Sequence, residues 1–245
     1  MALCSDAAMV LYYDIVGDYA DHDDWHTYEH MHERLSIPGF IRATRWVAQS
    51  CTPKYMVLYE VAGTGIATST DYLERLNHPT PWTTEMMSRF RDMIRGFCTV
   101  AGSSGFGLGH AAVSVRFTPV EGAESTLSDQ LVREVLPAMA SRRGMAGVHL
   151  LRPVPPPPMT IEQSIRGPDT PMSWLLLATG YDAEALRRAT DGHLKPQSLE
   201  RYGASPGMVS GSYVLNYTAT AQEVMRTEPN PTLPADVRAS DGVRS

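Results

Sequence analysis

The chain has 245 residues, of which 43% are hydrophobic and 20% charged, and this composition excludes a chain that is disordered throughout. Its formal net charge is −6 and it has no dense block of lysine and arginine, so we expect it to bind neither nucleic acid nor a membrane surface. No apolar run is long enough to span a membrane and no basic segment precedes the first apolar stretch, so we expect a cytoplasmic protein. Cys4, Cys51 and Cys98 lack C-x-x-C spacing, which indicates reduced, structural thiols.

Hydrophobic periodicity and turn signals predict the elements of the first half of the chain. In chain order these are a strand over 9–16, a helix over 24–35, a turn at Pro38-Gly39, strands over 40–48 and 55–61, helical segments near 71–76 and 83–97, and a strand near 98–101.

The second half predicts a similar series of elements. These are a strand over 111–117, a helix over 126–140, a turn at Gly144, strands over 147–152 and 173–179, a helix over 182–190 and a strand over 208–217. The order β-α-β-β-α-β therefore occurs twice. We expect a first unit over 1–105, a second unit over 106–219, a Gly/Ser-rich linker near 101–109, and a disordered tail over 220–245.

One stretch of the two halves can be aligned without gaps. Residues 29–46 fall on residues 134–151, which places Gly39 on Gly144. The second half has a longer strand-to-strand connection that contains four consecutive prolines, Pro155 to Pro158. Because such a run is stiff and cannot form a central strand, we expect a surface loop there, a candidate lid.

The strand pattern predicts how the two units pack. A β-α-β-β-α-β unit forms a four-stranded antiparallel sheet with both helices on one face. In residues 9–16 both alternating sets of side chains are largely apolar, so we expect both sheet faces to be buried. The sequence therefore predicts an α+β fold of two tandem ferredoxin-like units packed sheet to sheet. Over about residues 9–217 the chain resembles the dimeric α/β-barrel superfamily of ferredoxin-like proteins, with the two halves of the barrel fused.

Residues 21–40, DHDDWHTYEHMHERLSIPGF, form the most unusual segment, a short helix with four histidines and two glutamates. At about 100° per residue, Trp25, Tyr28, His32 and Leu35 form one stripe, and His26, Glu29, His30 and Glu33 form the next. We expect the first stripe to be buried. Burial would keep His32 neutral, as a general base requires, and Glu29 one turn away would orient it. The alternative is a core histidine bonded to a backbone carbonyl.

The same helix is similar to the E-H-x-P motif of EthD-like domains in that superfamily, and here the motif reads Glu29-His30-Met31-His32. The resemblance implies that His30 faces a pocket between the helices and the sheet. It also places His32 at the proline position, so the division of labour between the two histidines stays open. The second half has Glu134-Val135-Leu136-Pro137 and lacks the histidine, which implies a catalytic first half and a scaffold second half.

Seven further residues are expected to bind substrate. If they face the helices, the strand residues would line a small aromatic-walled cavity with a few polar groups, although ordinary strand packing is the alternative. The strand residues are Tyr12, Asp14, Arg42, Trp46 and Tyr59, and the helix adds Trp25 and Tyr28.

Other sites were weighed against this one. Residues His26 to His30 match the zinc motif H-x-x-E-H, but the sequence offers no obvious third ligand, so we expect no metal. The glycine-rich segment 102–109 lacks the lysine of a phosphate-binding loop. We expect no cofactor.

The leading hypothesis is a cofactor-independent lyase, isomerase or cyclase that performs acid–base chemistry on a small aromatic or carbonyl compound. His30, His32 or His26 and Glu29 would move the proton, and Tyr12, Tyr28 or Arg42 would stabilise oxyanion charge. One alternative is a cofactor-free or haem-dependent monooxygenase, as the resemblance implies, and another is a non-catalytic small-molecule binder. A small molecule is the expected partner, and a homodimer through other surfaces stays open.

Overall fold

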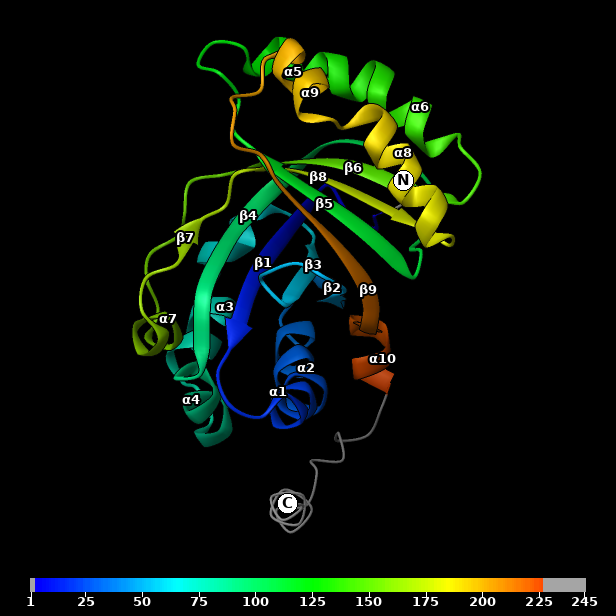
Figure 1. The fold of residues 1–245 in the computed structure, drawn as a ribbon. Coiled ribbons are helices and arrows are strands. Elements are labelled where there is room, and N and C mark those ends of the chain that lie inside the picture. The colour runs from blue at the N-terminus through cyan, green and yellow to red at the C-terminus, as the bar shows by residue number, and fades with distance from the viewer. Residues whose placement is uncertain (1–2, 227–245) are drawn as a thin grey trace.

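The computed structural model describes residues 3–226, in which eight strands close into an antiparallel barrel (Figure 1). Each half of the chain contributes one four-stranded sheet. The first sheet has the order β4-β1-β3-β2 and the second has the order β6-β8-β5-β9. The strands are β1 (Ala7–Ile15), β2 (Phe40–Ala48), β3 (Tyr55–Val61), β4 (Phe90–Gly105), β5 (Ala111–Phe117), β6 (Met145–Pro153), β8 (Trp174–Gly180) and β9 (Val209–Thr220).

Two long strands join the sheets. β4 pairs with β1 from Phe90 to Thr99 and with β6 from Cys98 to Gly105. β9 likewise pairs with both β5 and β2. These shared strands close the barrel without an unpaired edge between the two sheets.

Helices cover the outer face of each sheet (Figure 1). Over the first sheet lie α1 (Tyr19–Trp25), the π-helix η1 (His26–His30), α2 (Met31–Leu35), α3 (Thr70–Asn77) and α4 (Pro81–Met87), with the 3-10 turn η2 (Thr64–Thr68) before α3. Over the second lie α5 (Glu124–Gln130), the π-helix η3 (Leu131–Val135), α6 (Leu136–Ala140), α8 (Ala183–His193) and α9 (Pro196–Tyr202).

The correspondence between the halves extends to backbone detail. Gly39 and Gly144 both end their helix-to-strand turn in the left-handed region, with φ of 96° and 91°. The two π-helices occupy residues 26–30 and 131–135, which superimpose when the register of the gapless alignment is continued three residues toward the N-terminus. The predicted α+β fold of two tandem ferredoxin-like units packed sheet to sheet is therefore confirmed.

Side chains along each strand alternate between the helix-covered face and the barrel interior. In β1, Met9 and Tyr13 pack under the helices, whereas Val10 and Tyr12 point into the barrel. Both sets are almost completely buried. The barrel interior is therefore an apolar core shared by the two sheets, and each helical layer has its own core.

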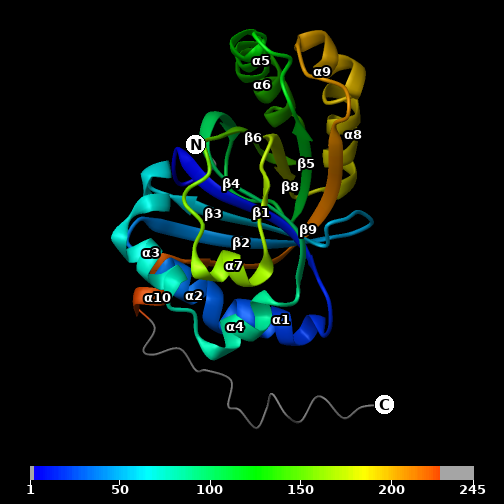
Figure 2. The ribbon, with the colours of Figure 1, turned by 90° about the vertical axis from the view of Figure 1, so that its left-hand side faces the viewer.

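The connection between β6 and β8 is more than a surface loop. After the prolines it forms α7 (Ile161–Arg166) and then β7 (Thr170–Pro171), which pairs with β4 in parallel. α7 packs against α3 and α4, so a segment of the second half covers the helices of the first (Figure 2).

Two predicted boundaries are wrong. Residues 90–97 begin β4 instead of ending a helix, because Met93 and Phe97 face the helices while Ile94 and Cys98 face the barrel, which is the strand period of two. Residues 101–105 of the expected linker are the end of β4.

The tail expected over 220–245 also begins differently. Thr220 ends β9 and residues 221–226 form α10 (Ala221–Arg226), and residues 227–245 lie outside the described residues. None of the helices within residues 3–226 combines the length and hydropathy needed to cross a bilayer.

Candidate active site under the first helix

The first helix turns its basic residues toward the sheet. His22, His26, His30 and Arg34 follow one another at intervals of four and are all buried. In a regular α-helix, four residues overshoot one turn by about 40°. The π turn, closed by a bond from the Met31 N–H to the His26 carbonyl, holds more residues per turn and offsets this drift. The π turn therefore aligns the four side chains on one face.

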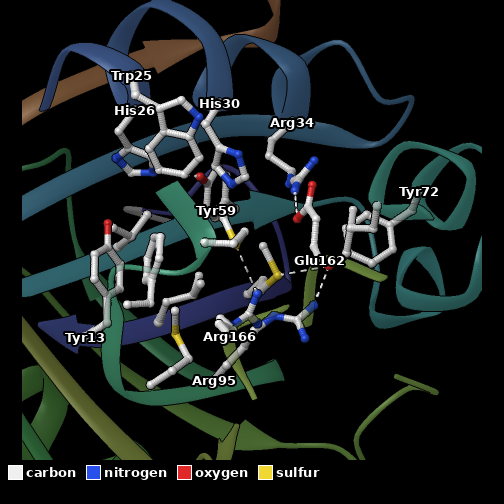
Figure 3. Close-up of a pocket in the computed structure, with 17 residues that line it drawn as sticks. Tyr13, Trp25, His26, His30, Arg34, Tyr59, Tyr72, Arg95, Glu162 and Arg166 are labelled. Carbon is white, nitrogen blue, oxygen red and sulfur yellow. Dashed lines mark hydrogen bonds and ion pairs between the residues drawn. The ribbon is translucent and has the colours of Figure 1, made fainter. Parts of the chain in front are cut away.

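A cavity lies between this helix face and the outer face of the first sheet (Figure 3). Its volume is about 30 Å³, space for one or two water molecules. Methionine and aromatic side chains form much of its wall. The lining residues with polar groups are Tyr13, Trp25, His26, His30, Arg34, Tyr59, Tyr72, Arg95, Glu162 and Arg166.

The hydrogen bonds of His26 fix its tautomer. Arg45, buried on β2, donates from Nη1 to His26 Nδ1 at 3.1 Å, and a guanidinium can only donate. The neutral ring therefore has its proton on Nε2, which donates to the Tyr59 hydroxyl oxygen at 3.2 Å. Burial, followed by the charge of Arg45, holds the pKa of His26 well below its usual value. The hydroxyl proton of Tyr59 remains to be donated to another acceptor beside the cavity.

His30 packs against an aromatic ring. Its ring centroid lies 4.3 Å from that of Trp25, whose Nε1 is itself anchored on Thr83. Within the described residues, the buried Nδ1 of His30 has no hydrogen-bond partner. Burial, and then the charges of Arg34 and Arg166, hold the pKa of His30 well below its usual value. His30 is therefore a neutral imidazole at the cavity wall, with an unused nitrogen.

A third histidine, His22, connects Tyr13 at the cavity wall to the partly exposed Asp23 on the same helix. The Asp23 carboxylate lies 3.0 Å from His22 Nδ1, and His22 Nε2 lies 3.1 Å from the Tyr13 hydroxyl. The carboxylate holds the ring proton on Nδ1, so Tyr13 donates to Nε2. Burial lowers the pKa of His22 more strongly than Asp23 raises it. Tyr13 lines the cavity, so the three groups form a buried hydrogen-bonded chain that ends at the partly exposed Asp23.

The far wall of the cavity comes from the second half of the chain. Glu162 of α7 forms a buried ion pair with Arg34 of α2. Arg166, also on α7, makes two bonds to Asp169, at 3.0 and 2.9 Å, and Arg95 of β4 contacts the same carboxylate at 3.4 Å. This cluster of three guanidinium groups and two carboxylates carries a net charge of about +1 when all are ionised.

The predicted buried stripe is correct for Trp25 and Leu35, which are buried, and wrong for Tyr28 and His32, which are only half-buried. The helix face toward the cavity is that of His26 and His30. His32 is half-buried on the other side, with Nε2 3.5 Å from the Tyr217 hydroxyl, and does not line the cavity. Burial lowers the pKa of His32 as well. Glu29 accepts from Thr80 and Thr83 at the start of α4, at 2.6 and 3.2 Å, and so binds two helices together instead of orienting an imidazole.

Most of the expected strand residues face the wrong way. Tyr12 and Trp46 lie in the barrel interior. Arg42 pairs with Glu60 at 2.5 Å, and Asp14 accepts from the Lys54 backbone N–H at 2.6 Å. Tyr59 does line the cavity, and so does Trp25 of the helix, whereas Tyr28 does not. Because both faces of these strands are apolar, their alternation alone does not tell which set faces the helices.

Sequence reasoning missed the charged half of the site. Arg34 and Tyr13 carried a signal, since one continues the four-residue spacing of the histidines and the other belongs to the opposite strand face from Tyr12. Glu162 and Arg166 had none, because they come from a connection whose path across the molecule is not encoded locally. Among residues 3–226, no group of three histidine, cysteine, aspartate or glutamate side chains is placed to hold a metal.

Comparisons with known proteins bear on the fold. No protein-family model and no curated protein matches the sequence. Among solved structures, an anthrone oxidase-like protein is similar over 90% of this chain and 96% of its own, with a TM-score of 0.62 and 10% identity. A candidate monooxygenase from Lactobacillus acidophilus is similar over 88% of this chain and 96% of its own, with a TM-score of 0.54 and 13% identity.

A third structure, a candidate monooxygenase from Fusobacterium nucleatum, covers 89% of this chain and 96% of its own, with a TM-score of 0.53 and 8% identity. Likeness at such low identity concerns the fold alone. By its strand order and by these similarities, the chain has the fold of the dimeric α/β-barrel proteins, with both halves of the barrel supplied by one polypeptide.

Proposed function

We propose that the protein is an enzyme that removes a proton from a small aromatic or carbonyl compound without a bound cofactor. The observation that carries this proposal is the unpartnered Nδ1 of His30, buried at a cavity that also holds a tyrosine hydroxyl and guanidinium groups. A neutral imidazole beside hydrogen-bond donors is the arrangement that proton abstraction next to a carbonyl requires.

His30 is the proposed general base. Its lowered pKa keeps the ring unprotonated at neutral pH. Its tilted ring contact with Trp25, with an interplanar angle of 33°, restricts the ring orientation and places an aromatic ring beside the imidazolium that forms. The proton passes from the substrate C–H or O–H to the imidazole, and the electron pair moves onto the substrate oxygen as an enolate or phenolate.

Tyr59 and the guanidinium cluster are the proposed stabilisers of that oxygen. Tyr59 has a proton to donate because its oxygen already accepts from His26. The net positive charge of Arg34, Arg95 and Arg166 with Glu162 and Asp169 lowers the energy of an anion more than that of its neutral parent. Return of the proton to a different carbon gives an isomerase, and departure of a leaving group gives a lyase.

Oxidation of the same anion is the second candidate function, and the similarity in fold to an anthrone oxidase-like protein favours it. A carbanion that takes up O₂ and loses water converts a CH₂ group to C=O. We assign no step to haem, because a cavity of about 30 Å³ has no room for a macrocycle.

Proton exchange tests the proposal before the natural substrate is known. In D₂O, NMR would follow exchange of the acidic C–H of anthrone and 2-tetralone. We expect catalysis by the wild type and a loss of at least about 100-fold in His30→Ala. His32→Ala is the matched control, since His32 lies on the same helix but outside the cavity, and should keep the rate.

Three outcomes separate the candidates. Exchange without O₂ consumption supports an isomerase or lyase, and stoichiometric O₂ consumption supports a monooxygenase. Equal exchange rates in wild type and His30→Ala, or binding of both compounds without exchange, would overturn the enzyme proposed here.

A further inference from the structure

A second, larger hollow lies on the outer side of the guanidinium cluster. It is a groove of about 290 Å³ between β4 and the connection that carries α7. Its walls are mostly apolar and contain Phe97, Met159 and Met172 together with five prolines. The prolines are Pro153, Pro156, Pro157, Pro168 and Pro171.

The backbone of β4 makes room for one wall of this groove. A Cβ atom on Gly96 would lie 2.5 Å from the Cβ of Met172, so a side chain at position 96 would displace that methionine. Because Gly96 has none, Met172 packs directly on the strand and is 6% exposed. Met159, which lies earlier in the same connection, is 61% exposed.

The floor of the groove is also part of the inner cavity. Arg95 lines both hollows, and Asp169 holds Arg95 on one side and Arg166 on the other. Gln163 donates to the same carboxylate at 2.8 Å. Two guanidinium groups therefore face one carboxylate at the junction of the hollows, with all three side chains at most 10% exposed. Together with the Arg34–Glu162 ion pair, the cluster has one positive charge in excess when all groups are ionised, and this favours an anionic group.

The inner cavity and the groove differ in the size of the group that each can bind. The inner cavity of about 30 Å³ accepts no more than the reacting atoms of a compound, whereas the groove of about 290 Å³ approaches the size of small-molecule sites. Proline rings are rigid and methionine thioethers contact aromatic rings favourably, so a planar ring binds there at a low cost in ordering the wall.

We propose that the groove is a binding site for a monoanionic aromatic compound, whose ring lies against the prolines and methionines and whose carboxylate or phenolate meets Arg95. Because the groove adjoins the inner cavity, it would bind the ring system of the enzyme's substrate while the reacting atoms enter the cavity. Only the identification of the bound compound with the substrate rests on the proposed function. Binding itself does not depend on it.

Titration with 1-naphthoate, followed through ¹³C-methyl methionine signals, tests the site. Ring currents should shift the methyl signals of Met159 and Met172. Met145, which lines a separate hollow near Phe106, and Met225, exposed on α10, should stay in place. Shifts confined to Met145 or Met225, or no shift up to the solubility limit of naphthoate, would overturn the proposal.

Paired variants sharpen the result. Met159→Trp fills the groove and should weaken naphthoate binding at least about tenfold. Ile161→Trp is the matched control, because Ile161 is also exposed on the connection but does not line the groove. Neutral 1-naphthamide should bind the wild type more weakly than naphthoate by a similar factor. Equal affinities for naphthoate in wild type and Met159→Trp would refute the assignment.

His30→Ala separates this proposal from the proposed function. The variant should bind naphthoate as the wild type does, since His30 does not line the groove. If His30→Ala keeps the exchange activity, the catalytic assignment fails while the groove stands. If the methyl signals of Met159 and Met172 do not shift with naphthoate, the proposed binding site is wrong, whether or not His30→Ala loses the exchange activity.

Discussion

Replacing Glu162 by glutamine tests whether the second half of the chain is held over the first by charge. Arg34 and Glu162 are each 3% exposed and form a buried ion pair between α2 and α7. Glutamine keeps the shape of the side chain but leaves the Arg34 guanidinium without a counter-charge.

The expected cost follows from that burial. Removing one partner of a buried ion pair typically costs about 3 to 5 kcal/mol, because the remaining charge is desolvated and unpaired. Arg34→Met should cost a similar amount by stranding Glu162. The double variant Arg34→Met/Glu162→Leu should be less destabilised than either single variant, since no buried charge remains. Arg187→Met is a control, because that arginine forms its ion pairs at an exposed surface and should change stability little.

Two measurements locate the loss. Urea unfolding gives the global free energy, and amide hydrogen exchange reports opening of residues 154–172 alone. Local opening would appear as lost protection in α7 with unchanged protection in β1 and β3. Single variants that match the wild type in both measurements, or a double variant whose cost equals the sum of the singles, would refute the reasoning.

Two further predictions concern stability. The unfolding free energy should fall as the pH drops below 6.5, because histidines in the unfolded chain become protonated while the buried histidines of the folded chain stay neutral. Burial lowers the pKa of His149 from 6.5 to about 4, so this residue alone removes about 3 kcal/mol between pH 6.5 and about pH 4 and about 2 kcal/mol by pH 5. His22, His26 and His30 act in the same direction, and a urea midpoint that stays constant between neutral pH and about pH 5 would contradict this. Gly39→Ala should destabilise by about 1 to 2 kcal/mol in thermal unfolding, because its φ of 96° suits glycine and the added Cβ would lie 2.8 Å from Ile66 Cδ1. Gly63→Ala, at an extended φ with no atom near the added Cβ, should cost less than about 0.5 kcal/mol, and equal losses would show that backbone strain is not the cause.

The fold could be predicted because the repeated order of strands and helices can be recognised from short sequence patterns in each half of the chain. Strand and helix periods repeat in the same order, and Gly39 and Gly144 mark the same left-handed turn in each half. The predicted boundary was wrong where two elements follow each other with no glycine or proline between them. This is the case at residues 88–90, where a single turn separates the end of α4 from the start of β4.

The site was predicted less well, for three physical reasons. The helix carrying the histidines was identified, but the stripe of His26 and His30 faces the cavity and that of His32 does not, because Arg45 and Glu162 pair with the buried polar groups of that face. Tyr12 and Trp46 were assigned to the wrong side of strands that are apolar on both faces. Glu162 and Arg166 reach the cavity only through tertiary structure, which no local pattern reveals.

One consequence follows from β4 and β9 being long enough to serve both sheets. When two identical subunits build such a barrel, every feature appears twice and any mutation strikes both copies. A single polypeptide removes that constraint, so here only the first half has the histidines of the cavity, and α7 of the second half packs over the helices of the first. We therefore expect saturation at one ligand per polypeptide.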